Sequence, residues 1–167
     1  MINHPSAHLS RRRLIGWLGA GIAVPVLAAC GAGDAAAKTY PVQFTAEEWR
    51  KRLTPEQFHI LREQGTEYPG TSALLKEHRR GTFVCAADGN PLFSSATKYE
   101  SGTGWPSFWR PIPRGITTAT DWTVGAARTE VLCTRCGGHL GHVFNDGPPP
   151  TGKRYCINGT ALMFRLG

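Results

Sequence analysis

Hydrophobic and polar residues follow two different patterns along this chain, and the change falls near residue 80. The earlier part fits two short amphipathic helices, each introduced by a capping box: Thr45 with Glu48, then Thr54 with Gln57. A proline follows Thr54 at the first helical position, and Gly65 supplies a stop for the second segment. The sequence therefore predicts two helices at the start of the domain.

A further turn of helix is predicted over residues 72–79, and the pattern changes after Gly81. From there, short apolar or β-branched runs are separated by Gly, Pro, Asn and Asp, which is typical of antiparallel strands joined by turns. The predicted strands cover residues 82–85, 92–95, 116–124, 129–133 and 155–166. Long helical periodicity is absent after residue 80, so the predicted fold class is α+β, mostly antiparallel β, with the helices segregated at the start.

Residues 1–37 have the pattern of an export signal. A twin-arginine pattern at residues 10–15 is followed by an apolar run that ends at residue 29. Because this run is shorter than the roughly 20 residues that cross a bilayer as a helix, we expect export to the periplasm by the twin-arginine route. Two processing sites remain open: a lipoprotein box before Cys30, which would leave a membrane-anchored lipoprotein, and cleavage after Ala37.

Without residues 1–37, 16 of the 19 basic and 11 of the 12 acidic residues remain, a formal net charge of +5. The charges lie in short groups such as 50–52 and 79–80, which is typical of a solvated surface, so we expect no nucleic-acid partner. About 130 residues are enough for one domain with a hydrophobic core. We predict a single domain over residues 42–167 and, by default for this size, a monomer.

Cys156 is the first candidate for chemistry, because Arg154 stands two residues before it. A guanidinium near a thiol favours the thiolate, which is the nucleophilic form. The alternative is a structural cysteine on a buried strand, since free cysteine is among the most buried residue types. The polar neighbours Arg154, Tyr155 and Asn158 are unusual for a plain core strand, so we favour a catalytic thiol.

His139 and His142 lie in a glycine-rich segment, and histidine is the natural acid or base near neutral pH. Because glycines permit tight turns and close approach, we predict that both imidazoles face a cleft and not the core. Asp146 would orient an imidazole or Arg154, although residues 145–147 are equally a turn signal.

Trp105 stands in an aromatic loop at residues 102–109. Such a loop is either a structural corner that packs into the core or one wall of an apolar pocket. An indole beside proline and glycine could hold a methyl group, which would fit a substrate with a small apolar end.

Cys85, Asp88, Cys133 and Cys136 form two short knuckles that are about 45 residues apart. Two CxxC knuckles would predict a tetrahedral zinc site, but here the second position of the first knuckle is an aspartate. Two alternatives remain open: a zinc site with Asp88 as the fourth ligand, and a disulfide between Cys133 and Cys136 in an oxidising compartment.

Taken together, the motifs resemble the methionine sulfoxide reductase B family, which reduces the R epimer of methionine sulfoxide. The resemblance covers residues 42–167. It rests on five ordered motifs: SGTGWPSF at 101–108, GHLGHVF at 138–144, DGP at 146–148, PTG at 150–152 and RYCIN at 154–158.

The resemblance implies two antiparallel sheets behind the N-terminal helices and no organic cofactor. It implies that the Cys156 thiolate attacks the sulfoxide sulfur and becomes a sulfenic acid. His142, helped by His139 and Asn158, would guide protonation of the departing oxygen. Trp105 and Phe144 are the implied substrate-binding residues. The implied partners are methionine sulfoxide in oxidised proteins and a thioredoxin-like reductant.

The chain departs from the family pattern at two positions. Many members have a cysteine where Thr103 stands, and that cysteine closes a disulfide on the sulfenic acid. Regeneration here must use another thiol: Cys85, Cys133, Cys136 or an external one. Members that contain zinc have cysteine in place of Asp88, so the second departure leaves the metal open.

Two other hypotheses compete with this interpretation. The first is an exported zinc-binding module in which Cys156 is structural, which predicts metal-dependent folding and no turnover. The second is a cysteine hydrolase that uses Cys156 and His142. A hydrolase would need an oxyanion hole and an acyl substrate, and it would not explain the loop around Trp105.

Overall fold

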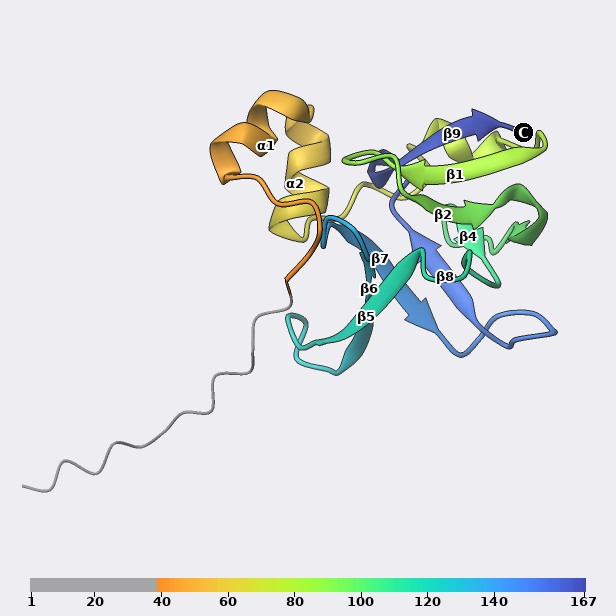
Figure 1. Ribbon diagram of the computed structural model, residues 1–167. Helices are drawn as coiled ribbons and strands as arrows, with labels where there is room; N and C mark the ends of the chain where they lie inside the picture. Colours follow the sequence, from red (N-terminus) through yellow and green to blue (C-terminus); the bar gives the residue numbers. More distant parts are fainter. Residues whose placement is uncertain (1–38) are drawn as a thin grey trace, which may run out of the picture. The chain divides into compact units, whose positions relative to one another are not determined.

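The computed structural model describes residues 39–167, and within them nine strands form two antiparallel sheets preceded by two short helices (Figure 1). This arrangement confirms the predicted α+β class and the two implied sheets. The predicted signal and its two processing sites lie outside the described residues. Among residues 39–167, no helix has the length and apolar character needed to cross a membrane.

Both predicted capping boxes are present. Helix α1 covers Ala46–Arg52, where the Thr45 hydroxyl accepts a hydrogen bond from the amide of Glu48 (3.2 Å) and the Glu48 carboxylate accepts one from the Thr45 amide (2.8 Å). Helix α2 covers Pro55–Glu63 and has the same reciprocal cap. These caps satisfy amides that a short helix would otherwise leave without partners.

The predicted helical turn over 72–79 is shorter than expected. A 3-10 helix, η1, covers only Ala73–Lys76. The turn stops there because the Glu77 carboxylate accepts a hydrogen bond from the amide of Arg79 (2.9 Å), so a side chain takes up a donor that a continuing helix would use.

The smaller sheet has the strand order β2-β1-β9, and the larger one has β3-β4-β8-β7-β6-β5. The strands of the smaller sheet are β1 (Gly81–Cys85), β2 (Pro91–Ser94) and β9 (Leu162–Leu166). The strands of the larger sheet are β3 (Lys98–Tyr99), β4 (Ser107–Phe108), β5 (Ile116–Asp121), β6 (Arg128–Cys133), β7 (His139–Phe144) and β8 (Arg154–Ile157). Two further 3-10 turns are η2 (Ser95–Thr97) and η3 (Gly159–Ala161).

Strand β7 was not predicted, because its glycines indicated turns. Gly141 instead permits close packing of β7 on β8: it has φ 151°, and a Cβ atom there would overlap the carbonyl oxygen of Cys156. The last predicted strand, 155–166, is in fact two strands in different sheets, separated by η3. The short strands β3 and β4 were also missed.

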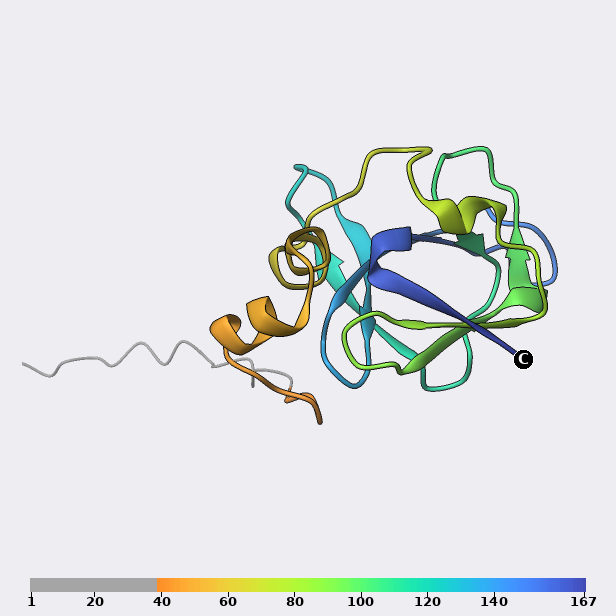
Figure 2. The same cartoon turned by 90° about the horizontal axis from the view of Figure 1, so that it is seen from above.

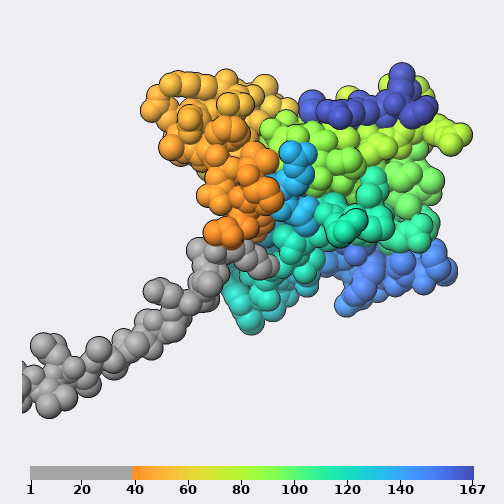
Figure 3. Space-filling view, viewed as in Figure 1, coloured from red at the N-terminus to blue at the C-terminus, as the bar shows by residue number. Residues whose placement is uncertain are grey.

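The core lies between the sheets and the helices. There Phe108 of β4 stacks on Phe93 of β2, with ring centroids 4.4 Å apart, and meets Phe83 of β1 edge to face, with centroids 4.9 Å apart; all three are fully buried. Seen from above, α1 and α2 lie at one side of the strands (Figure 2). In the space-filling view this helical segment, coloured orange to yellow, rests directly against the strands (Figure 3).

Candidate active site and candidate metal site

Strand register places five polar residues in one row across the larger sheet. Tyr99 pairs with Ser107, Ser107 with Cys156, Cys156 with His142, and His142 with Glu130. Directly opposite residues on neighbouring strands point to the same face of a sheet. Cys156 and His142 are therefore neighbours although they are 14 positions apart in the chain.

Cys156 and His142 line a surface pocket of about 130 Å³. The other residues that line it are Thr66, Trp105, Arg128, Gly141, Phe144 and Asn158. The structure thus gathers four predicted site residues other than Cys156 around one opening: His142, Trp105, Phe144 and Asn158.

The wall formed by Trp105 is held by side-chain to backbone hydrogen bonds that involve Glu67, in the segment before η1. Its indole Nε1 donates to the carbonyl of Glu67 (3.2 Å). The amide of Glu67 donates to the side-chain oxygen of Asn158 (3.1 Å), and Asn158 Nδ2 donates to the carbonyl of Leu140 (3.1 Å). Asn158 is 3% exposed, so its role in the structure is to connect the tryptophan wall to β7.

Glu67 also fixes the turn that follows β8. Its carboxylate accepts hydrogen bonds from the amides of Gly159 (2.6 Å) and Thr160 (2.9 Å) and from the Thr160 hydroxyl (2.7 Å). These are the donors at the start of η3, so the carboxylate takes up amides that would otherwise lack partners.

His142 is held by a carboxylate that sequence reasoning did not identify. Its Nε2–H donates to Oδ2 of Asp121 on β5 (2.8 Å), and the same oxygen accepts a hydrogen bond from Arg128 (2.6 Å). Because an ionised carboxylate only accepts, Nε2 carries the hydrogen, and Nδ1 is the nitrogen that gains or loses a proton. The distance of 21 residues between the two partners explains why no local motif pointed to Asp121.

The charges around His142 act in opposite directions. Burial lowers the pKa of His142, the hydrogen bond to Asp121 raises it, and the charge of Arg128 lowers it. Hydrogen bonds from Thr123, and after them that from His142, hold the pKa of Asp121 well below its usual range. The Asp121 carboxylate therefore stays ionised beside a histidine that burial keeps mostly neutral.

His139 is buried, since its side chain is only 3% exposed, and it lines a separate pocket beside Glu130 and not the pocket of Cys156 and His142. Its Nδ1–H donates to Oε1 of Glu130 (2.6 Å), and Gln64 Nε2 donates to the same oxygen (3.2 Å). The prediction that His139 avoids the core was wrong, because the first half of β7 is buried, whereas the glycines indicated turns. The rings of His139 and His142 still lie close, with centroids 5.4 Å apart.

Arg154 lies beside Cys156 but is engaged elsewhere. It donates two hydrogen bonds to the Asp146 carboxylate (2.9 and 2.7 Å) and stacks over the Phe144 ring at 4.4 Å. Burial raises the pKa of Cys156, while Thr103 and then Arg154 lower it. The predicted effect of the guanidinium is present, but desolvation outweighs it. Of the two roles considered for Asp146, the structure shows the pairing with Arg154.

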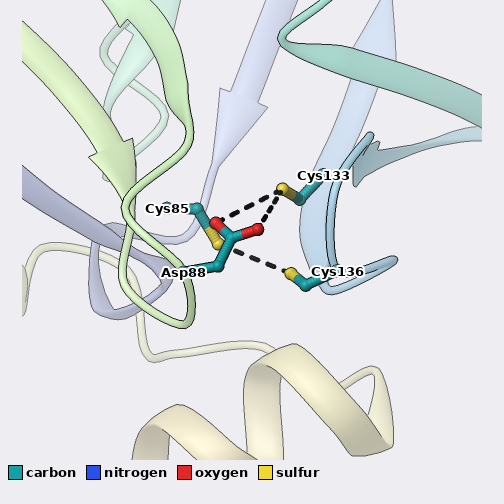
Figure 4. Close-up of side chains that lie close together, drawn as sticks. All are labelled: Cys85, Asp88, Cys133 and Cys136. Atoms are coloured by element: carbon teal, nitrogen blue, oxygen red, sulfur yellow. Dashed lines mark hydrogen bonds between the residues drawn. The ribbon is translucent and has the colours of Figure 1, made fainter. Parts of the chain in front are cut away.

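The remaining cysteines of residues 39–167 gather elsewhere, in what we call the three-cysteine cluster: Cys85, Asp88, Cys133 and Cys136 (Figure 4). Cys85 and Asp88 come from β1 and the turn after it, and Cys133 and Cys136 come from the end of β6 and its turn. All four side chains point toward one another in Figure 4, and all four described cysteines are free thiols.

The donor atoms of the three-cysteine cluster fit a tetrahedral metal ion. They all lie within 4.8 Å of one another. Cys85 Sγ lies 3.7 Å from Cys136 Sγ, and Cys133 Sγ lies 3.7 Å from Asp88 Oδ2. A tetrahedron with zinc–sulfur bonds of about 2.3 Å has edges of about 3.8 Å, so this spacing suits such an ion.

The electrostatics of the cluster favour a cation. Hydrogen bonds from Cys136 and Cys85 lower the pKa of Cys133, and the same interactions raise the pKa of Cys85 and Cys136. Burial raises the pKa of Asp88. A thiolate and a carboxyl group thus share a buried site whose nearest guanidinium, that of Arg135, is 4.0 Å from the carboxylate.

Comparison with known proteins agrees with the resemblance. A SelR domain matches residues 53–166 of the chain. A protein of Leptospira interrogans serogroup Icterohaemorrhagiae serovar Lai (strain 56601), named peptide methionine sulfoxide reductase MsrB, is 58% identical over 127 residues, which are 75% of this chain and 97% of that protein.

Relatives of the same name occur in other organisms. The protein of Agrobacterium fabrum (strain C58 / ATCC 33970) is 55% identical over 118 residues, 70% of this chain and 87% of its own length. That of Methanosarcina barkeri (strain Fusaro / DSM 804) is 54% identical over 125 residues, 74% of this chain and 88% of its own length.

Proposed function

The chain belongs to the SelR-domain family of peptide methionine sulfoxide reductases, MsrB, and is an oxidoreductase that reduces methionine sulfoxide; we propose that Cys156 carries out this reduction on the R epimer. The observation that carries the proposal is the pairing of a half-buried thiol with His142 across β7 and β8, at the edge of a pocket walled by Trp105. A nucleophile, a proton donor and an apolar wall are the parts this reaction needs.

In the proposed reaction, the Cys156 thiolate attacks the sulfoxide sulfur and the oxygen is transferred. The sulfur of methionine sulfoxide is reduced by two electrons and leaves as methionine. Cys156 is oxidised by two electrons and keeps the oxygen as a sulfenic acid, Cys–SOH. The proton balance is closed because the thiol proton, lost when the thiolate forms, returns to the transferred oxygen.

His142 is the proposed carrier of that proton. Its Nε2 is committed to Asp121, so Nδ1 is the atom that would gain and release it. Buried His139, paired with Glu130, would support His142 from behind, and Asn158 would keep the tryptophan wall in place. We assign Asp121, Glu130 and Asn158 as positioning residues, because each acts through a neighbour.

Selection of the R epimer would arise from two different walls. Trp105 and Phe144 offer apolar surface for the methyl group, whereas His142 offers a polar edge for the oxygen. Exchanging the methyl group and the oxygen, as in the S epimer, would place the oxygen against an indole and leave the imidazole without a partner, which is costly in a partly desolvated pocket.

We further propose that an external thiol regenerates Cys156. One thiol forms a mixed disulfide with release of water, and a second thiol, or the second cysteine of a thioredoxin-like protein, releases reduced Cys156. The support is that Thr103, and not a cysteine, lies next to the Cys156 sulfur, while the other three described cysteines contact one another in the three-cysteine cluster.

The three-cysteine cluster is proposed to hold a zinc ion. The four side chains would bind the ion, and the ion would cross-link the turn after β1 to the turn after β6. No step of the reaction needs it, since no residue of the cluster lines the pocket.

Export by the twin-arginine route to the periplasm, and repair of oxidised exported proteins there, also remain proposals that rest on residues 1–37 of the sequence. Cell fractionation with Arg11 and Arg12 changed to lysine tests the route, because retention of the variant in the cytoplasm is expected. Changing Cys30 to serine tests lipid attachment: loss of membrane association supports the lipoprotein, and an unchanged distribution supports cleavage after Ala37.

The experiment that tests the reaction follows the purified protein with dithiothreitol and the separate R and S epimers of a peptide methionine sulfoxide. Turnover of the R epimer alone, abolished by Cys156→Ser, is the expected result. Equal turnover of both epimers would overturn the proposed selectivity, and full activity of the serine variant would overturn the assignment of the nucleophile.

A further inference from the structure

A chain of hydroxyl groups leads to the Cys156 sulfur from the side opposite His142. Ser107, its partner on β4, lies with its Oγ 2.7 Å from the Oγ of Ser101. Ser101 Oγ lies 2.8 Å from Thr103 Oγ1, and Thr103 Oγ1 lies 3.8 Å from Cys156 Sγ. Three hydroxyls and the thiol thus form one connected path.

Two backbone groups restrict the direction in which this chain donates. The hydroxyl of Ser107, whose residue is 1% exposed, donates to the carbonyl of Trp105 (3.2 Å). The amide of Thr103 donates to Ser101 Oγ (3.4 Å). Since a carbonyl cannot accept a proton at neutral pH, the chain does not carry protons away from the thiol. What remains free to change is the rotation of the Ser101 and Thr103 hydroxyls.

The two protonation states of Cys156 select different rotations. A neutral thiol can donate to Thr103 Oγ1, and the hydroxyls then donate in sequence toward Trp105. A thiolate has no hydrogen to give, so the Thr103 hydroxyl turns and donates to the sulfur. Ser101 can in turn donate to Thr103 Oγ1, which strengthens that hydrogen bond by polarising it.

We propose that Thr103 is a further catalytic residue, whose hydroxyl donates to the Cys156 thiolate, and that Ser101 and Ser107 are positioning residues that hold this hydroxyl in place. The inference deepens the proposed function, because it rests on Cys156 as the nucleophile. It also gives a function to Thr103, which stands where many members of the family have a cysteine.

The thiolate of Cys156 needs such a donor because its environment opposes charge. Burial raises the pKa of the thiol, and the nearby guanidinium of Arg154 directs two hydrogen bonds at Asp146. A hydroxyl at 3.8 Å that is already oriented by its neighbours can stabilise the charge without a large rearrangement.

The competing explanation is that Thr103 only fills space beside the sulfur. Valine has nearly the same shape but no hydroxyl, and serine keeps the hydroxyl but lacks the methyl group. Thr103→Val and Thr103→Ser therefore separate hydrogen bonding from packing, and Ser101→Ala tests the neighbour that orients the hydroxyl.

The experiment measures the pKa of Cys156 in the intact protein, from the rate of alkylation by iodoacetamide as a function of pH, with mass spectrometry of the peptide that contains Cys156. One charged hydrogen bond corresponds to about one pKa unit. We expect Thr103→Val to raise the pKa by about that amount, which lowers the thiolate fraction near neutral pH about tenfold. Thr103→Ser should stay within about 0.3 units of the wild type, and Ser101→Ala should shift in the direction of the valine variant.

A shift below about 0.5 units in Thr103→Val, or an equal shift in Thr103→Ser, overturns the inference. An unmoved Ser101→Ala overturns the positioning role of Ser101. Protection of the buried Cys85, Cys133 and Cys136 from alkylation in the same samples reports that each variant is folded. The titration needs no substrate, so its failure is distinct from failure of the proposed reduction, which epimer turnover tests.

Discussion

The described residues contain the same functional group in two contrasting places. At the pocket, one thiol stands alone, half buried, beside a hydroxyl, a guanidinium and an imidazole. In the three-cysteine cluster, three buried thiols and a carboxyl group contact mainly one another. Isolation with access to solvent leaves a sulfur lone pair available to a substrate, whereas crowding of several donors produces a shared negative charge that suits a cation.

The comparison shows that residue type alone does not assign the role of a cysteine. Cys156 follows Tyr155 and Cys133 follows Leu132, and each lies on a β-strand that pairs with an antiparallel neighbour. Their different chemistry comes from residues that are distant in the chain: Thr103 and His142 for the first, Cys85 and Asp88 for the second. One region is therefore expected to govern activity, and the other to govern stability.

The largest expected effect is a loss of activity at the pocket without a loss of stability. Cys156→Ser should lower kcat by about 10³-fold or more, because it removes the proposed nucleophile. Thermal unfolding should change little, since serine fits the space of the thiol. Differential scanning calorimetry beside steady-state kinetics checks both expectations, and a large fall in Tm would contradict the separation of the two regions.

The second largest effect is a loss of thermal stability at the three-cysteine cluster. Cys136→Ser should remove a proposed zinc ligand and lower Tm by about 10 °C or more. A strong chelator should do the same to the wild type and to Cys156→Ser, but should add little to Cys136→Ser. Metal analysis should give a zinc content of about one ion per chain in the wild type.

The outcome that contradicts this second prediction is equally specific. If the purified protein holds no zinc and its Tm is insensitive to chelator, the cluster works without metal. In that case Cys133 and Cys136 become candidates for a redox pair.

A smaller effect concerns the charge beside His142. Asp121→Asn keeps the size and a hydrogen-bonding oxygen but removes the charge that raises the pKa of His142 against burial. The pKa of His142 should fall further. Because the acid form is needed to protonate the oxygen, activity is lost as pH rises through this pKa, so the alkaline limb of the kcat profile should move to lower pH.

At pH 7 the same variant should lose activity about tenfold. Glu100→Gln is the matched control: Glu100 has an exposed side chain, pairs with Lys98, and lies outside the pocket. A profile of Asp121→Asn that superposes on that of the wild type would exclude a positioning role for Asp121.

The smallest predicted effect concerns the guanidinium near the nucleophile. Arg154→Lys keeps the positive charge but loses the bidentate hydrogen bonding to Asp146 and the stacking on Phe144. Arg154 lowers the pKa of Cys156 through its charge and through a hydrogen bond. Since lysine keeps the charge, the pKa should rise by less than about one unit. Alkylation kinetics of Cys156 measure it, with Lys153→Ala as control; a rise as large as that expected for Thr103→Val would contradict the prediction that the positive charge of lysine is sufficient.

Local signals predicted the start of the fold correctly. The capping boxes at Thr45 and Thr54 place both helices, because a cap is an interaction between residues three positions apart. Strands β1, β2, β5 and β6 lie within one to three residues of their predicted bounds. Strand β7 was missed since Gly141 indicates a turn locally, and only its contact with β8 makes a glycine necessary there.

Local signals also pointed to the thiol, the His142 imidazole and the tryptophan that the structure brings together at one pocket, because ordered motifs carry them. They missed Asp121, Arg128, Glu130 and Glu67, which reach the site from other strands and loops. They also predicted that His139 avoids the core, whereas it is buried, because the burial of a strand residue depends on what covers that face of the sheet.

The sequence by itself determined the family, the two N-terminal helices, the mostly antiparallel architecture and the candidate reactive groups, because each of these depends on residue type and short spacing. Only the tertiary structure decided which groups meet. The register of β4, β8 and β7 brings Ser107, Cys156 and His142 into one row, and two distant turns bring the donors of the three-cysteine cluster within 4.8 Å of one another. The physical reason is that hydrogen-bond register and burial are set by pairing between strands, and these pairings join residues whose separation in the chain carries no local signal.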